Sequence, residues 1–203
     1  MSFESNIREE LAKILGKEWV KDDSVTLYTY RCDGLTLYTA PPMGVVFPGA
    51  VQELVSVVKL LHKHKISFIA RGAGTGLSGG AVPQDESVII EMARFKEVHE
   101  VDWINRTITV DPGVINLRIT EDVQSQGYHY APDPSSQKAC TIGGNVAENS
   151  GGPHTLKYGV TVNHVLGVEM VFPDGELVKI GGKHLGMSGP DLLGLVVGSE
   201  GTF

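Results

Sequence analysis

The sequence predicts a fold that mixes α-helices with short β-strands. Helical periodicity is clearest in apolar residues that recur at the spacing of one helix face, namely Val51, Leu54, Val55, Val58 and Leu61. Short apolar runs at 66–70 and 87–92 are typical of strands. Glycine is also abundant, with 25 residues in 203, or about 12% against a typical ~7%. The glycines gather at 72–80, 143–152 and 181–201, so a local backbone reason is expected at each cluster.

The predicted elements begin with a helix over residues 3–15, where Ile7, Leu11, Ile14 and Leu15 form one stripe that Gly16 ends. Residues 20–44 are mixed and close on prolines and a glycine, so they are expected to be irregular. A short strand at VVFPGA, the helix after it and the strand at 66–70 together predict a β-α-β unit over 45–70.

Further strands are predicted over 87–92, 97–102 and 107–113, with turns at Asn105 and at Pro112-Gly113. A helix over 115–126 should end at Gly127. Pro173-Asp174-Gly175 predicts a hairpin between VLGVEMVF and ELVKI. Near the end of the chain, four apolar residues are expected in the core: Leu192, Leu193, Leu195 and Val196.

Charge and composition exclude several classes of protein. Seventeen Lys and Arg against 24 Asp and Glu give a net charge of −7, whereas a nucleic-acid binder needs a basic surface. No run approaches the ~20 apolar residues of a membrane span. The acidic N-terminus lacks the pattern of a secretory signal, and two cysteines are too few for a disulfide framework. These features predict a cytoplasmic chain.

The first glycine cluster, RGAGTGLSGG at 71–80, contains a literal GxGxxG directly after an apolar strand. A Rossmann dinucleotide site would need a helix to begin within these glycines, but Pro83 and a strand from about Val88 leave no room for one. No Walker A sequence is present. Glu91 could imitate the ribose-binding acid of a Rossmann site, but is expected to be a solvated or capping carboxylate. A loop of outward-facing amides, with Thr75 and Ser78 hydroxyls, suits a pyrophosphate.

The second and third clusters are TIGGNVAENSGG at 141–152 and GSEGT at 198–202. Small residues in the second cluster would let the backbone approach a flat ring closely. Tight turns are the alternative explanation for any one pair of glycines.

The order of RGAGTGLSGG, APDPSS, IGGNVAENSGG, KYG and GSEGT identifies a family resemblance from about residue 20 to residue 203. The chain resembles the FAD-binding domains of glycolate oxidase FAD-binding subunits and of D-lactate and D-2-hydroxyglutarate dehydrogenases, in the vanillyl-alcohol-oxidase type superfamily. The resemblance implies an α+β, PCMH-type domain whose two subdomains hold FAD between them. The expected organisation is an N-terminal helix and leading segment at 1–40 and the FAD-binding domain at 41–203, with subdomains at about 41–103 and 104–203.

By the same resemblance, the pyrophosphate loop would comprise Arg71, Gly72, Ala73, Gly74, Thr75, Gly76, Leu77, Ser78 and Gly79. Pro132 and Asp133 would lie by the adenine and ribitol portion. The isoalloxazine and ribityl chain would meet Thr141, Ile142, Gly143, Gly144, Asn145, Ala147, Gly151 and Gly152. Tyr158, Gly159 and Glu200 would complete the pocket. The first loop lacks the histidine through which relatives often attach flavin, so FAD should be non-covalent. Cys140 is expected to be a small buried side chain that fills space in the interior, rather than a thioether link to the flavin ring.

The resemblance implies hydride transfer from a small 2-hydroxy acid, such as glycolate or D-lactate, to flavin N5. The resemblance implies that the substrate groups lie in a C-terminal domain, which this chain is expected to lack, so no catalytic residue is assigned. Two hypotheses stay open. The chain is either part of a 2-hydroxy-acid dehydrogenase or a FAD-binding module without catalytic turnover of its own. A Rossmann NAD module is a distant third. An iron–sulfur or second flavin subunit is a possible partner, and could hold the chain at the inner face of the membrane.

His62 and His64 point to different sides of a helix and predict no metal site, and His154 is expected to be a surface loop residue.

Overall fold

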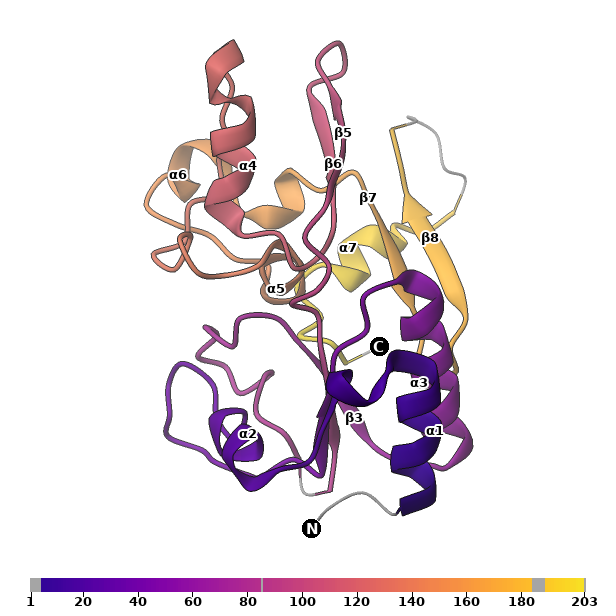
Figure 1. Cartoon of the computed structure of the whole chain (residues 1–203). Coiled ribbons are helices and arrows are strands. Elements are labelled where there is room, and N and C mark those ends of the chain that lie inside the picture. The colour runs from indigo at the N-terminus through magenta and orange to yellow at the C-terminus, as the bar shows by residue number, and fades with distance from the viewer. Residues whose placement is uncertain (1–4, 85, 184–188, 203) are drawn as a thin grey trace. The chain divides into compact units, whose positions relative to one another are not determined.

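The computed structural model describes residues 5–84, 86–183 and 189–202 (Figure 1). The chain divides into two compact units, the first comprising 1–94 with 171–178 and the second 95–170 with 179–203. The subdomain boundary expected near residue 103 would fall within a β-hairpin, whereas the division near residue 94 keeps both strands of that hairpin in one unit.

The first unit is built on a four-stranded sheet in the order β1-β2-β4-β3. These strands are β1 (Val20–Lys21), β2 (Gly44–Val46), β4 (Val88–Glu91) and β3 (Phe68–Arg71). β2 and β3 both run parallel to β4, and β1 is antiparallel to β2. The predicted β-α-β unit is therefore present, with α3 (Val51–Lys63) joining β2 to β3 and β4 inserted between the two strands.

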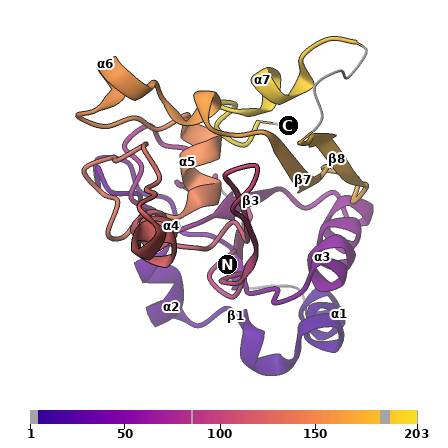
Figure 2. The same ribbon diagram turned by 90° about the horizontal axis from the view of Figure 1, so that it is seen from above.

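Helices cover both faces of this sheet. On one face, α1 (Ser5–Leu15) and α3 pack side by side (Figure 2) against Val46, Val88 and Ile90. On the other, Leu27 of α2 (Ser24–Thr29) packs with Val45 and Ile89. Because adjacent residues of a strand point to opposite faces, the continuous burial of β2 and β4 suits a sheet that is covered on both sides.

The expectation that residues 20–44 are irregular is wrong for part of that range, which contains β1 and α2. Helix α2 buries only Leu27, so it lacks the apolar periodicity that reveals longer helices. Asp23 caps its N-terminus by accepting hydrogen bonds from the Thr26 amide at 2.9 Å and the Thr26 hydroxyl at 2.7 Å. A 3₁₀ turn, Lys17–Trp19, precedes β1.

The second unit begins with an antiparallel hairpin of β5 (Val98–Asp102) and β6 (Thr107–Val110). Helix α4 (Asn116–Val123) continues into the 3₁₀ turn Gln124–Gln126 and ends at Gly127, whose φ of 79° is left-handed. The helix predicted over 115–126 and its glycine stop are thus confirmed.

The remaining elements are α5 (Ile142–Glu148), α6 (Thr155–Tyr158), a 3₁₀ turn (Thr161–Asn163), β7 (Gly167–Val171), β8 (Leu177–Gly181) and α7 (Leu192–Val196). Strands β7 and β8 pair as the predicted hairpin. The expectation that the apolar residues of α7 belong to the core is wrong: none of the helix is buried, and Leu192 and Leu195 are 45% and 56% exposed. Val197, just beyond the helix, is buried instead.

Candidate functional site

The first glycine cluster forms an open loop between β3 and β4. Within its described residues, the connection contains turns and bends and no helix, which confirms the argument against a Rossmann site. Gly74 and Gly79 have φ values of 66° and 89°, a region that side chains with a Cβ rarely adopt. The loop therefore follows a path that depends on glycine.

The amides of this loop are available to a ligand. No acceptor in the described part of the chain takes a hydrogen bond from the backbone N–H groups of residues 73–78, whereas the Gly79 amide is bonded to Asp33. Consecutive free amides in a turn form an anion-binding nest. This donor set fits the pyrophosphate of FAD and needs no net positive charge on the protein.

Arg71 lies beneath the loop instead of extending from it. Its side chain is buried, and Nη1 donates to the Ala81 carbonyl at 2.7 Å and to the Tyr30 carbonyl at 3.4 Å. A Cβ at Gly74 would collide with this guanidinium. Arg71 thus packs against Gly74 and bonds the connection after the loop at Ala81.

Glu91, at the end of β4, is a buried carboxyl in register with Arg71 of β3. The expectation that it is solvated is wrong, since only 4% of the residue is exposed. Burial raises its pKa from 4.5 to about 7, although the positive charge of Arg71 opposes the rise. The base of the loop therefore holds a group that titrates near neutral pH.

Replacing Glu91 with glutamine is expected to remove a pH dependence of stability. The folded chain holds this proton more tightly than the unfolded chain, so wild-type stability should fall as pH rises above 4.5 and level off beyond 7. The loss should be about 1–3 kcal/mol between pH 5 and pH 8, measured by urea unfolding at each pH. Glu97→Gln, at an exposed glutamate, is the control and should keep the wild-type slope; an unchanged slope in Glu91→Gln would contradict the prediction.

The second cluster is a short helix anchored by buried amide side chains. Thr141 caps α5 by accepting from the Gly144 amide at 3.4 Å. Asn145 is only 2% exposed; its Oδ1 accepts from Asn116 at 2.8 Å and its Nδ2 donates to Cys140 Sγ at 3.3 Å. Asn116 also donates to the Pro132 carbonyl at 3.2 Å. The side chain of Asn145 therefore faces the protein interior, and Cys140 is the buried filler that was expected.

Gly152 brings the second cluster against the APDPSS segment. A Cβ on Gly152 would collide with the backbone carbonyl of Asp133, so only glycine allows this approach. The Asp133 carboxylate bonds the ring of His154, and this contact lowers the pKa of Asp133. His154 is an exposed loop residue, as expected.

The third cluster is joined to the end of α5 by backbone hydrogen bonds. The Gly198 amide donates to the Val146 carbonyl at 2.9 Å, and the Glu200 amide donates to the Ala147 carbonyl at 2.8 Å. Asn149, left-handed at φ 48°, ends α5 and accepts from the Val162 amide at 2.9 Å. Two motifs about fifty residues apart in the sequence are thus adjacent in the second unit.

The residues expected to bind FAD divide between the two units. Residues 71–79 belong to the first unit, and every other expected residue belongs to the second. In the second unit, Ile142, Gly143, Gly144, Ala147, Gly151 and Gly159 are half-buried, whereas Tyr158 and Glu200 are exposed. Sequence reasoning missed Asp33, Gly34 and Asn116, which support these segments through long-range contacts that no local pattern reveals.

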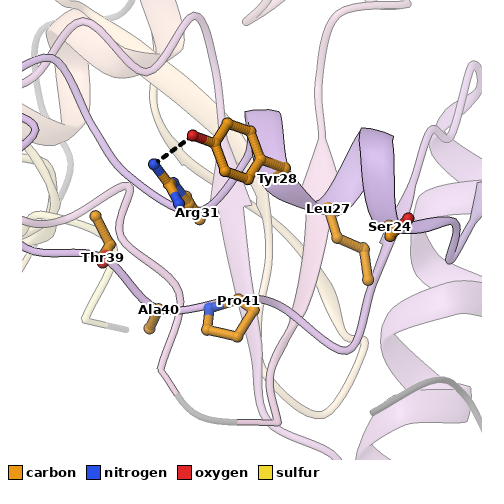
Figure 3. A pocket seen from close by; sticks show the side chains of 7 residues that line it. All are labelled: Ser24, Leu27, Tyr28, Arg31, Thr39, Ala40 and Pro41. Atoms are coloured by element: carbon orange, nitrogen blue, oxygen red, sulfur yellow. Dashed lines mark hydrogen bonds between the residues drawn. The ribbon is translucent and has the colours of Figure 1, made fainter.

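A separate hollow of about 310 Å³ lies beside α2 in the first unit (Figure 3). Leu27, Ala40 and Pro41 contribute to its mainly apolar lining. At its edge, Arg31 donates a hydrogen bond to the Tyr28 hydroxyl at 2.9 Å. None of the residues expected to bind FAD lines this hollow, so it is distinct from the glycine loop.

The described residues contain neither a candidate membrane span nor a candidate metal site. No helix in the part of the chain described here is long and apolar enough to cross a membrane. Among the same residues, no group of three or more His, Cys, Asp or Glu side chains is placed to hold a metal ion.

The chain is similar to known FAD-binding domains in both sequence and fold. A family profile described as "FAD binding domain" matches residues 42–181, and the chain belongs to this family, whose cofactor is FAD. Solved structures agree: alkyldihydroxyacetonephosphate synthase superposes with a TM-score of 0.85 at 25% identity, over 99% of this chain and 42% of that one. 4-Ethylphenol oxidase from Gulosibacter chungangensis, at 24% identity, shares the fold with a TM-score of 0.81 over 95% of this chain and 39% of its own. The α+β, PCMH-type fold is thereby confirmed.

Within this family, the chain is similar in sequence to glycolate oxidase subunits and to D-lactate dehydrogenases. Glycolate oxidase subunit GlcD of Escherichia coli K12 is 48% identical over 85% of this chain and 34% of its own length. The GlcD subunit of Bacillus subtilis is 38% identical over 97% of this chain and 42% of its own. D-lactate dehydrogenase of Archaeoglobus fulgidus is 38% identical over 85% of this chain and 40% of its own. The predicted resemblance is confirmed, and the chain spans between a third and about two fifths of these relatives.

Proposed function

We propose that this chain is the FAD-binding portion of a flavin-dependent oxidoreductase that acts on a small 2-hydroxy acid such as glycolate or D-lactate. The main support is the loop at 73–78, whose free amides suit a diphosphate, in a domain similar to glycolate oxidase and D-lactate dehydrogenase sequences. When bound, FAD would supply the acceptor for the substrate hydride.

Within this proposal, the chain's own residues bind and orient the cofactor. Amides of residues 73–78 donate to the diphosphate, and the small residues of α5 and Gly151 allow close backbone approach to the flavin. The side chain of Asn145 supports α5 from within, so its contribution to the cofactor comes from its backbone. Groups that bind and deprotonate the hydroxy acid are assigned to the part of the relatives that this chain does not span.

FAD is proposed to be held non-covalently, because the first loop has no histidine and Cys140 is buried against Asn145. Purified protein at equilibrium with saturating FAD should carry bound flavin, with absorbance bands near roughly 370 and 450 nm, measured by ultrafiltration. Denaturation should then release the yellow colour into the filtrate. Colour that stays with the denatured polypeptide would contradict non-covalent binding, and absence of bound flavin at saturating FAD would contradict the proposed function.

The alternative is a FAD-binding module without turnover. It is favoured by the coverage of the relatives, since well over half of each lies outside the matched region. The purified 203-residue chain is expected to bind FAD weakly and to show no dye reduction with glycolate or D-lactate. Robust dye reduction by this chain alone would overturn that expectation.

Partners and location are also proposals. Because the most similar sequences include a protein named as a subunit of glycolate oxidase, a second subunit carrying an iron–sulfur centre or a flavin is proposed to accept electrons. A cytoplasmic location, free or at the inner face of the membrane through that partner, is supported by the unpaired state of Cys32 and Cys140.

A further inference from the structure

The glycine loop needs an external support to keep its amides in one arrangement. Glycine loses more conformational freedom on ordering than any other residue, and the loop amides 73–78 have no acceptor of their own among the described residues. A flexible loop would have to be ordered when the ligand binds, which weakens affinity. The contacts that fix the loop in advance are therefore expected to matter for binding.

The support comes from the connection that follows α2. The buried carboxylate of Asp33 accepts from the Gly79 amide at 3.1 Å through Oδ2 and from the Leu35 amide at 3.0 Å through Oδ1. The Gly34 amide donates to the Gly76 carbonyl at 3.0 Å. These bonds hold both the middle and the end of the loop.

Gly34 also touches the loop directly. A Cβ at this position would lie 2.9 Å from the Thr75 carbonyl oxygen and 3.2 Å from that of Gly76, which is closer than real Cβ atoms normally approach backbone. Gly34 itself is exposed and does not have a positive φ. An alanine here would thus press on the loop without straining its own backbone.

The charge of Asp33 makes a direct ligand role unfavourable. A carboxylate repels a diphosphate, and this one is only 6% exposed, with both oxygens already accepting backbone bonds. Its carboxylate holds the Gly79 and Leu35 amides, and Arg71 holds the same connection through the Ala81 carbonyl.

We propose that Asp33 and Gly34 are positioning residues for the FAD pyrophosphate loop, holding residues 76–79 in the binding arrangement before the ligand arrives. This inference rests on the proposed FAD-binding function. It gives a role to part of the leading segment at 1–40, which lies before the matched family region at 42–181.

The test compares Asp33→Ala and Gly34→Ala with the wild-type chain. Each variant should raise the Kd for FAD, measured by titration of flavin fluorescence, by about 10- to 100-fold. Without FAD, exchange of the hydrogen-bonded amides in peptides covering 34–35 and 79–82 should be at least several-fold faster, with peptides elsewhere unchanged. Asp23→Ala is the matched control, because Asp23 also accepts from a backbone amide in the first unit but caps α2 instead; its FAD affinity and loop exchange should equal wild type.

The outcomes separate the inference from the proposed function. If wild type shows no FAD binding, the proposed function fails, and the exchange measurement still tests whether Asp33 and Gly34 hold the loop. If wild type binds FAD but both variants stay within twofold in affinity and in loop exchange, the positioning role is wrong. If Asp33→Ala does not fold, Gly34→Ala decides; unfolding of that exposed-site variant as well would assign the segment to global stability and overturn the proposal.

Discussion

Alanine at Gly152 is expected to destabilise the chain by about 3 kcal/mol or more, because its methyl group would occupy the position of the Asp133 backbone carbonyl. Backbone cannot rotate away as the end of a long side chain can, so the 132–133 segment must shift. Such a shift would also disturb the bond from Asn116 to the Pro132 carbonyl. A fall of about 6–12 °C in melting temperature is expected for a chain of this size, measured by circular dichroism without FAD.

Gly144→Ala is the matched control in the same glycine cluster. A Cβ there has only the Thr141 hydroxyl nearby, at 3.4 Å, and the residue lies in helix α5. Since alanine favours helix more than glycine does, the melting temperature should stay within about 2 °C of wild type or rise slightly. Equal losses in the two variants would show that the contact between Gly152 and Asp133 is not responsible.

Alanine at Asn145 is expected to lower the free energy of unfolding by about 2–4 kcal/mol in the absence of FAD. The substitution removes the acceptor for Asn116 and the donor to Cys140, and it leaves a cavity at a site that is 2% exposed. Urea unfolding of the FAD-free protein measures the loss directly.

This experiment separates an interior support from a side chain that contacts FAD. A contact residue would reduce FAD affinity and leave the stability of the FAD-free chain near wild type. Asn163→Ala is the control: Asn163 is exposed and its side chain accepts from one backbone amide, at 3.0 Å, so its loss should be at most about 1 kcal/mol. A loss of that small size at Asn145 would contradict the interior role.

Local sequence patterns were sufficient to predict the longer helices and the turns. Helix α3 shows apolar residues at helical spacing, and Gly127 and Pro173-Asp174-Gly175 have the conformational preferences of the stops and turns that they form. Local signals failed where they were short or ambiguous. Helix α2 is six residues long, and the apolar run of α7 resembles a core segment although Leu192 and Leu195 are exposed.

The glycine loops were also predictable, because no other residue type accepts positive φ or such close backbone contact so readily. Proline at position 83 and the nearby strand were enough to exclude the helix of a Rossmann site. What the loops contact was not predictable. Asp33 and Gly34 lie about forty residues before the atoms that they hold, and Asn116 lies 29 residues before Asn145.

The sequence by itself determined the class of protein, since five short motifs in a fixed order carry the resemblance to FAD-binding domains. Only the tertiary structure decided which side chains are buried and which backbone groups they bond. Arg71, expected in the pyrophosphate loop, has a buried guanidinium that bonds the Ala81 carbonyl. Glu91 is a surface-type residue that the sheet buries, which raises its pKa to about 7. The physical reason is the same for both: charge is a property of the residue, whereas burial and partners depend on segments that meet only in the folded chain.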